Sequence, residues 1–344
     1  MDLKALRKMS RNTLSLDEFM NEVYLDSQGK HDYNINSSNL KMDVKGRLAT
    51  KPFEDFEGFN LEFDALGLEQ MCTKIEMPDL SKYGQKLLDM GQTARFSSLF
   101  NFHLDEFNKN GGKDLWVRSK EDKCRAIFTD KYGIYDNDFV AENIYENFKD
   151  KNVDIVGFSL NDSYMNCRIR LLDNTFNAGR KGKDDPLYIA IHITNSEVGF
   201  STVNMSLVVY RLVCSNGLIR EESNLIMKHK HIGIGSEKCD ELTEKLTFAF
   251  EIAQTKGTGM LEEFAETQEE IITSPMENIK YLSRMQGYSQ KFTERVEQNY
   301  LEEKNSTRYG LINAFTAAAR ELDDDKRLDV ERFAGNLIYR NLLK

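Results

Sequence analysis

The spacing of apolar residues changes along the chain, and each change marks a different kind of secondary structure. Between about residues 116 and 231, apolar and polar residues alternate in short runs, whereas from residue 236 onward apolar residues recur every three to four positions. Alternation is typical of strands, and a spacing near 3.6 is typical of amphipathic helices. This order favours an α+β fold with an antiparallel sheet of about five to seven strands.

The alternating region begins with an expected hairpin over residues 116–129, followed by one helix that Asn137 or Asp138 caps and that ends near Phe148. Four further strands are expected in the runs VDIVGFSL, YMNCRIRLL, LYIAIHIT and STVNMSLVVYRLV. Two buried faces follow from the alternation, namely Met165, Cys167, Ile169 and Leu171 in one strand and Leu187, Ile189, Ile191 and Ile193 in the next. Asn166, Arg168 and Arg170 would then lie on the opposite, solvated face.

Four segments are expected in the chain. They are a flexible or partly helical arm over 1–55, a helical segment over 56–112, an antiparallel sheet core with one inserted helix over 113–235, and an acidic helical region over 236–344. Pro275 directly after Ser274 is typical of a helix start in the last segment. The fold is therefore a sheet with an amino-terminal helical segment and a larger carboxy-terminal helical region.

Charge and cysteine content bear on the class of protein. The net charge is −10, and residues 236–305 hold 15 acidic and 8 basic side chains, so the acidity is concentrated there. No apolar run approaches the length of a membrane span, and the first residues lack the apolar core of a secretory signal. We therefore expect a soluble, intracellular protein without a membrane partner. The five cysteines are far apart and form no C-x-x-C pair, which predicts reduced thiols without a disulfide or zinc site.

Several separated motifs resemble those of one protein family. They are RAIFTDKYGIYDND (125–138), TNSEVGFSTVNMSLVVYRLVCSNGLI (194–219), KHIG (230–233) and RYGLINAFTAAA (308–319). With their N-S-E-V-G and R-L-V-C-S-N-G stretches, they are similar in order to those of a family of uncharacterised phage- and plasmid-related proteins, a domain of unknown function. The resemblance extends over about residues 60–335. It implies a mobile-element protein that works in the host cytoplasm, and it supplies no catalytic residue.

Two motifs of the alternating region have a structural and a chemical interpretation. Asn195-Ser196-Glu197-Val198-Gly199 predicts a turn, and the alternative gives Glu197 the role of general base or metal ligand. Asn216-Gly217 predicts a type I′ hairpin turn. Cys214 would then be a buried thiol at a strand end, and the alternative of a nucleophilic Cys214 would need His192 or His231 as its base.

His229 and His231 form a His-x-His pair that would lie on one side of an extended strand. Three interpretations remain open: a metal site, a phosphate contact helped by Lys228 and Lys230, and a solvated strand end. The chain has neither a P-loop nor a dinucleotide-binding fingerprint. We expect no cofactor and no resident metal.

The residues that most favour a ligand surface are basic. Between 166 and 183 the chain has five basic residues and a single acidic one, Asp173. The basic residues are Arg168 and Arg170 in a strand and Arg180, Lys181 and Lys183 in the following loop. Such a face would neutralise phosphates, and Tyr164, Tyr188 or Tyr210 could stack on bases. The alternative is a solvated hairpin whose charges protect a sheet edge.

These observations favour a non-enzymatic, nucleic-acid-associated accessory protein of a phage or plasmid that binds single-stranded DNA in replication or recombination. Its expected nucleic-acid contacts are Arg168, Arg170, Arg180, Lys181, Lys183, Lys228, His229, Lys230 and His231. The alternative is a protein-interaction or assembly component that forms a homo-oligomer or engages a host or phage protein. A metal-dependent nuclease that uses Glu197 and the histidines is a third hypothesis.

Overall fold

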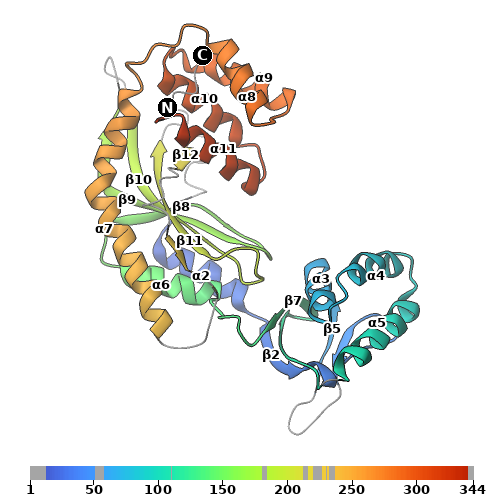
Figure 1. Ribbon diagram of the computed structural model, residues 1–344. Coiled ribbons are helices and arrows are strands. Elements are labelled where there is room, and N and C mark those ends of the chain that lie inside the picture. The colour runs from blue at the N-terminus through green and yellow to red at the C-terminus, as the bar shows by residue number, and fades with distance from the viewer. Residues whose placement is uncertain are drawn as a thin grey trace.

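The computed structural model describes residues 13–50, 58–109, 111–179, 184–211, 216–219, 227–229, 231 and 237–339. The fold is α+β, with two sheets and a larger helical region in the carboxy-terminal third. Figure 1 shows two lobes, a smaller one built on the six-stranded sheet and a larger one built on the seven-stranded sheet. The expected α+β class is confirmed, but the expected single sheet core is in fact divided between two sheets.

The smaller lobe contains a sheet in the order β2-β6-β7-β5-β4-β3, and only β5 and β7 are parallel among its pairs. Its strands are β2 (Lys30–Asn36), β3 (Leu40–Met42), β4 (Leu48–Thr50), β5 (Asn60–Phe63), β6 (Asp114–Lys120) and β7 (Lys123–Thr129). Its helices are η1 (Ser37–Asn39), α3 (Ala65–Lys74), α4 (Asp79–Asp89) and α5 (Thr93–Asn108). The expected hairpin over 116–129 is the β6–β7 pair.

A flexible or partly helical arm is expected over 1–55, and the described part of it holds helix α2 (Leu16–Ser27) together with strands that the expectation did not include. Residues 30–36 form β2, which pairs along its whole length with β6. Ile35 of this strand is buried in the core of the smaller lobe, together with Phe96, Phe100 and Leu115. The low hydrophobicity of this strand concealed it, because its stabilising partner lies far along the chain.

The larger lobe contains a sheet in the order β1-β8-β9-β10-β11-β12, with β13 also paired to β11, and all its pairs are antiparallel. Its strands are β1 (Thr13–Leu14), β8 (Val153–Leu160), β9 (Met165–Asn177), β10 (Pro186–Asn195), β11 (Val203–Arg211), β12 (Asn216–Ile219) and β13 (Met227–His229). The four strands expected after the inserted helix are thus confirmed as β8 to β11. Asn216 and Gly217, expected in a turn, lie instead within β12 and pair with β11.

The larger lobe also holds most of the helices. They are α2 (Leu16–Ser27), α6 (Asn137–Phe148), α7 (Glu237–Glu266), α8 (Pro275–Met285), α9 (Gln290–Glu303), α10 (Arg308–Ala319) and α11 (Asp324–Asn336). The inserted helix α6 ends as expected, but its N-cap is Asp136, one residue before the expected position. The helix start at Pro275 is confirmed.

One face of the seven-stranded sheet forms the main core. Met165, Cys167, Ile169 and Leu171 of β9 and Leu187, Ile189, Ile191 and Ile193 of β10 are all buried there, as the alternation predicts. Helix α7 crosses this face and contacts β9, β10 and β11 (Figure 1). Gly257 allows the close approach of the helix, because a Cβ at this position would lie 2.7 Å from Cγ1 of Ile189. Removal of such apolar area from water is the main stabilising term of the lobe.

Three cysteines of the described chain lie in these cores. Cys72, Cys124 and Cys167 are free and buried, which confirms the expectation of reduced thiols at these positions. Burial raises the pKa of Cys72 and of Cys167 to about 12, because a thiolate would be poorly solvated there. Cys214 and the side chain of Cys239 lie outside the described residues.

Candidate functional site

The second face of the seven-stranded sheet is polar, and it carries the residues expected to bind a ligand. Along β9 and the residue before it, Tyr164, Asn166, Arg168 and Arg170 alternate with the buried apolar set. His192 lies opposite Arg168 on β10, and Ala190 lies opposite Arg170. Leu328 of α11 packs against Ala190, so this helix covers part of the face. We call this surface the polar face.

Arg168 lies on the predicted face, but the prediction that its side chain is solvated is wrong. Only 4% of the residue is exposed. Its Nη2 donates to the carboxylate of Glu331 on α11, and the other oxygen of that carboxylate accepts from Nε of Arg327 at 3.1 Å. Glu331 therefore bridges two guanidinium groups, and α11 is held over this part of the sheet by charge-assisted hydrogen bonds.

Arg170 is also buried rather than solvated, with 9% of the residue exposed. Both its Nε and its Nη2 donate to Asp154 on the neighbouring strand β8, the former at 2.8 Å. Its guanidinium carbon lies 5.0 Å from the ring centroid of Tyr188 and 5.7 Å from that of Tyr210. A bidentate pair and two cation–π contacts satisfy this side chain, so a direct phosphate contact at Arg170 is not favoured.

The other predicted contact residues fall at different places. Arg180, Lys181, Lys183 and Lys230 lie outside the described residues, as does the side chain of His229. Lys228 is exposed, and its main-chain oxygen accepts from Nζ of Lys245 at 3.0 Å.

His231 is buried, which corrects the interpretation of this residue as part of a solvated strand end. One ring nitrogen lies 3.2 Å from the main-chain oxygen of Gly133, and the other lies 3.1 Å from Oδ1 of Asn195. Tyr132 stacks between this ring and Phe128, with ring centroids 5.1 and 3.7 Å away. The side chain of His231 therefore contributes to packing where the two lobes meet.

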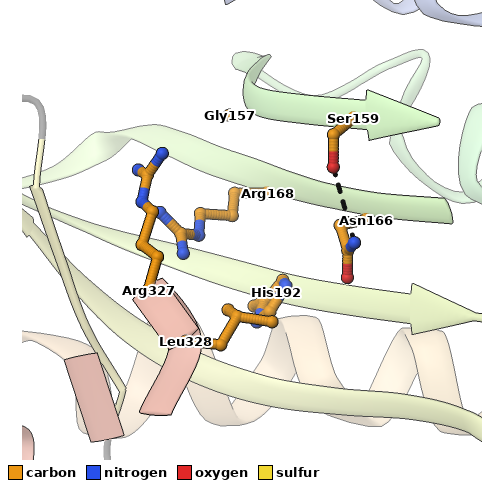
Figure 2. Close-up of a pocket in the computed structure, with 7 residues that line it drawn as sticks. All are labelled: Gly157, Ser159, Asn166, Arg168, His192, Arg327 and Leu328. Atoms are coloured by element: carbon orange, nitrogen blue, oxygen red, sulfur yellow. Dashed lines mark hydrogen bonds between the residues drawn. The ribbon is translucent and has the colours of Figure 1, made fainter. Parts of the chain in front are cut away.

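A small cavity opens on the polar face beside Arg168, with a volume of about 20 Å³. Figure 2 shows its lining, which comprises Gly157, Ser159, Asn166, Arg168, His192, Arg327 and Leu328. A bulge in β8 between Val156 and Ser159 contributes to its wall. Gly157 lies in this bulge with a φ of +61°, a conformation that side chains rarely adopt.

The positive charges around this cavity outnumber the negative ones. Arg168 and Arg327 are both cationic, and Glu331 is the carboxylate between them. Burial holds the pKa of His192 well below its usual range, and the nearby charge of Arg168 acts in the same direction. The imidazole is therefore neutral near pH 7, and these four groups carry one net positive charge.

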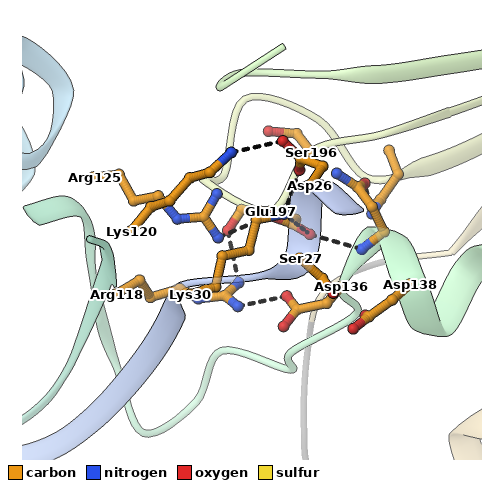
Figure 3. A network of polar contacts seen from close by, with 12 residues as sticks. Asp26, Ser27, Lys30, Arg118, Lys120, Arg125, Asp136, Asp138, Ser196 and Glu197 are labelled. Atoms are coloured by element: carbon orange, nitrogen blue, oxygen red, sulfur yellow. Dashed lines mark hydrogen bonds and ion pairs between the residues drawn. The ribbon is translucent and has the colours of Figure 1, made fainter. Parts of the chain in front are cut away.

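Glu197 of the N-S-E-V-G motif lies in a polar network that joins the lobes (Figure 3). Its carboxylate accepts from Nη2 of Arg125 at 2.7 Å, from Nζ of Lys30 and from the main-chain N–H of Asn137 at 2.8 Å. Lys30 and Arg125 belong to the smaller lobe, whereas Asn137 begins α6 of the larger lobe. The expected turn is confirmed, and the side chain of Glu197 connects the two lobes.

Arg118 of β6 adds further hydrogen bonds to the network that joins the two lobes. It donates to the main-chain oxygen of Glu197 at 2.9 Å and to the carboxylates of Asp32 at 2.8 Å and Asp136 at 2.5 Å. Nearby, Asp26 of α2 pairs with Lys30 and Lys120. Buried charges of this kind persist because each has a hydrogen-bonded partner of opposite sign.

This network excludes the interpretation of Glu197 as a general base. Burial alone would raise the pKa of its carboxyl, but Lys30, Arg125 and the Asn137 amide together lower that pKa to about 2. A carboxylate with so low a pKa accepts a proton poorly near neutral pH. No group of three or more histidine, cysteine, aspartate or glutamate residues that could hold a metal occurs in the described chain.

A stacked aromatic pair, of which Phe200 is exposed and Tyr164 is half-buried, lies at one end of the polar face. The ring of Phe200, in the turn after β10, stacks on Tyr164 with centroids 5.6 Å apart and an interplanar angle of 27°. Phe200 is 51% exposed, although a large apolar side chain gains free energy when buried. The sequence analysis named Tyr164 as a residue that could stack on bases, but it missed Phe200. The available signal was the position of Phe200 directly after Gly199 of the predicted turn.

Arg327 and Glu331 were also missed. Their spacing of four residues on a helix is typical of a surface ion pair, and the sequence does not indicate that the pair lies against the sheet.

Comparisons with protein-family models, with curated proteins and with solved structures find no match to this chain. The resemblance to the phage- and plasmid-related family therefore stays a prediction. No helix among the described residues combines the length and the apolar character needed to cross a membrane.

Proposed function

We propose that the protein binds single-stranded nucleic acid along its polar face, as an accessory protein of a phage or plasmid in the cytoplasm of the host. The observation that carries this proposal is the stack of Phe200 on Tyr164 at the end of a sheet face that also holds buried arginines. Exposed aromatic rings provide platforms for bases, and these platforms tolerate any sequence because every base has a flat face.

The path of the bound nucleic-acid strand over the protein follows from the alternation of side chains along β9. Tyr164 and Arg168 are four residues apart on the same side of the chain, which corresponds to about 13 Å in a strand. A base on the aromatic pair would therefore leave its neighbouring phosphates above Asn166 and the cavity at Arg168. The 15 acidic and 8 basic residues of 236–305 disfavour binding of a polyanion on the helices of that region.

The experiment is a titration of fluorescently labelled oligothymidylate, duplex DNA and single-stranded RNA, followed by anisotropy over a series of salt concentrations. The proposal predicts saturable binding of a single strand, with an affinity that falls as salt rises because bound phosphates release counterions. Absence of binding to all three probes, together with a defined oligomer in a native mass measurement, would contradict the proposal and favour the assembly alternative.

A further inference from the structure

The cavity beside Arg168 contains a buried hydrogen-bond donor that lacks an acceptor. Nη1 of Arg168 has no hydrogen-bond partner among the described residues, although the side chain is 4% exposed. A buried charged donor without an acceptor is costly, and such groups in native proteins commonly mark a missing water, ion or ligand.

The lining of the cavity identifies the kind of acceptor that would fit. Figure 2 shows the guanidinium of Arg327 close to that of Arg168, with Asn166 and Ser159 further along the same face. Ser159 Oγ lies 3.4 Å from Nδ2 of Asn166, and this amide and hydroxyl line the same cavity as the two cations. Arginines, amides and hydroxyls are the groups that proteins use to hold phosphate oxygens.

The size and charge of the cavity narrow the choice further. A volume of about 20 Å³ accommodates a group the size of a water molecule, such as a single phosphoryl oxygen. Glu331 neutralises one of the two guanidinium charges, and the neutral His192 adds none. One net positive charge matches the single negative charge of a phosphodiester better than the double charge of a terminal phosphate.

We infer that this cavity is a phosphate-binding site that takes one non-bridging oxygen of a phosphodiester, which accepts a hydrogen bond from Nη1 of Arg168. The inference rests on the proposed function, since a phosphodiester in a nucleic-acid strand is its ligand. It assigns a role to α11, because Arg327 forms one wall of the site and Glu331 orients both guanidinium groups. Arg168 acts as an anchored donor inside the sheet, rather than as a free surface cation.

The test compares two variants with one control. Arg327→Gln removes a cation of the site and leaves the Arg168–Glu331 pair in place. Ser159→Val narrows the cavity and keeps both arginines. Lys326→Gln is the control, since Lys326 is an exposed cation of the same helix that pairs with Asp323, and it is not among the residues that line the cavity. Urea unfolding of each variant shows whether it is folded.

With oligothymidylate as the probe, Arg327→Gln should weaken binding about tenfold and reduce the slope of log affinity against log salt by about 0.7. Ser159→Val should weaken binding as well, and Lys326→Gln should bind like the wild type. If folded Arg327→Gln and Ser159→Val proteins keep the wild-type affinity and slope, the inference is overturned, while the proposed function stands.

A second probe, inorganic phosphate, separates the two proposals. If the wild type binds no oligonucleotide, yet inorganic phosphate raises its melting temperature and this effect disappears in Arg327→Gln, the anion site is supported and the proposed function fails. If inorganic phosphate has the same effect on the wild type and on Arg327→Gln, and no oligonucleotide binds, both proposals fail.

Discussion

Arg168 on β9 and Glu331 on α11 form a buried ion pair although they are 163 residues apart in the chain. The pair connects the polar face of the seven-stranded sheet to the last described helix. It also explains why an arginine expected in solvent is buried, since the carboxylate that accompanies it offsets its charge and accepts a hydrogen bond from Nη2. The same contact places Arg327 beside the cavity.

This ion pair predicts a specific pattern of stability. Arg168→Met should lower the free energy of unfolding by about 3–5 kcal/mol, because Glu331 loses one of its two cationic partners while still buried. Adding Glu331→Leu should restore part of this loss, since no uncompensated carboxylate remains. Urea unfolding of the two single variants and the double variant measures the coupling. If the stability losses of the two single variants simply add in the double variant, the two residues are not energetically coupled and the prediction is contradicted.

The Glu197 junction predicts a dependence of stability on pH. The pKa of Glu197 is lowered to about 2 in the folded protein, below its ordinary value of 4.5, so the folded state holds its proton less tightly. The corresponding stabilisation, about 3 kcal/mol, is present above pH 4.5 and is lost as the pH falls toward 2. Unfolding free energies measured by urea between pH 7 and pH 3 report this loss.

Glu197→Gln provides the matching variant for that measurement. It should be less stable than the wild type at pH 7, because Lys30 and Arg125 lose their shared carboxylate, and its stability should depend less on pH. Glu262→Gln, at an exposed position of α7, is the control and should follow the wild-type curve. A Glu197→Gln curve parallel to the wild type would show that this carboxyl does not carry the pH dependence.

The aromatic pair predicts a loss of binding without a loss of fold. Phe200→Ala should weaken single-strand binding about 5- to 150-fold, the effect of removing one base-stacking ring. Phe102→Ala is the control, because Phe102 is 59% exposed on α5 of the smaller lobe, away from the polar face. Anisotropy titrations of both variants measure the effect. Equal affinities of the Phe200→Ala and Phe102→Ala variants would show that the Phe200 ring does not contribute to binding.

The buried thiols predict low reactivity. Cys72, Cys124 and Cys167 should stay unmodified when the native protein is treated with iodoacetamide at pH 8, because burial raises the pKa of each thiol and excludes the reagent. Peptide mapping by mass spectrometry identifies the modified positions. All three should react after unfolding in urea. Alkylation of Cys124 in the native protein would show that the core of the smaller lobe opens readily.

The sequence could predict the parts of the fold whose stabilising contacts are local. The alternation in β8 to β11 predicted those strands and the buried face of β9, because each side of a strand meets one environment. The spacing of apolar residues likewise predicted helices from residue 237 onward. β3 and β4 were missed because three residues are too few to show a period. The division into two sheets depends on pairings such as β2 with β6, which no local pattern encodes.

The candidate site could be predicted only in part for the same reason. Arg168 and Asn166 were correctly placed on one side of β9 by alternation, but their exposure depends on what packs above them. Leu328, Arg327 and Glu331 reach that side only because α11 folds back over the sheet. Hydrophobic patterning of a strand cannot show that a helix from the end of the chain covers its polar face.

The most direct test of the central proposal is to map where a single strand lies on the protein. Ultraviolet irradiation of the wild type bound to oligothymidylate, followed by digestion and mass spectrometry, identifies the peptides that crosslink to the bases. Our account predicts crosslinks to the peptides that contain Tyr164 and Phe200, the rings that stack at the end of the polar face. Crosslinks confined to the helices of the smaller lobe, with none at these two residues, would contradict it.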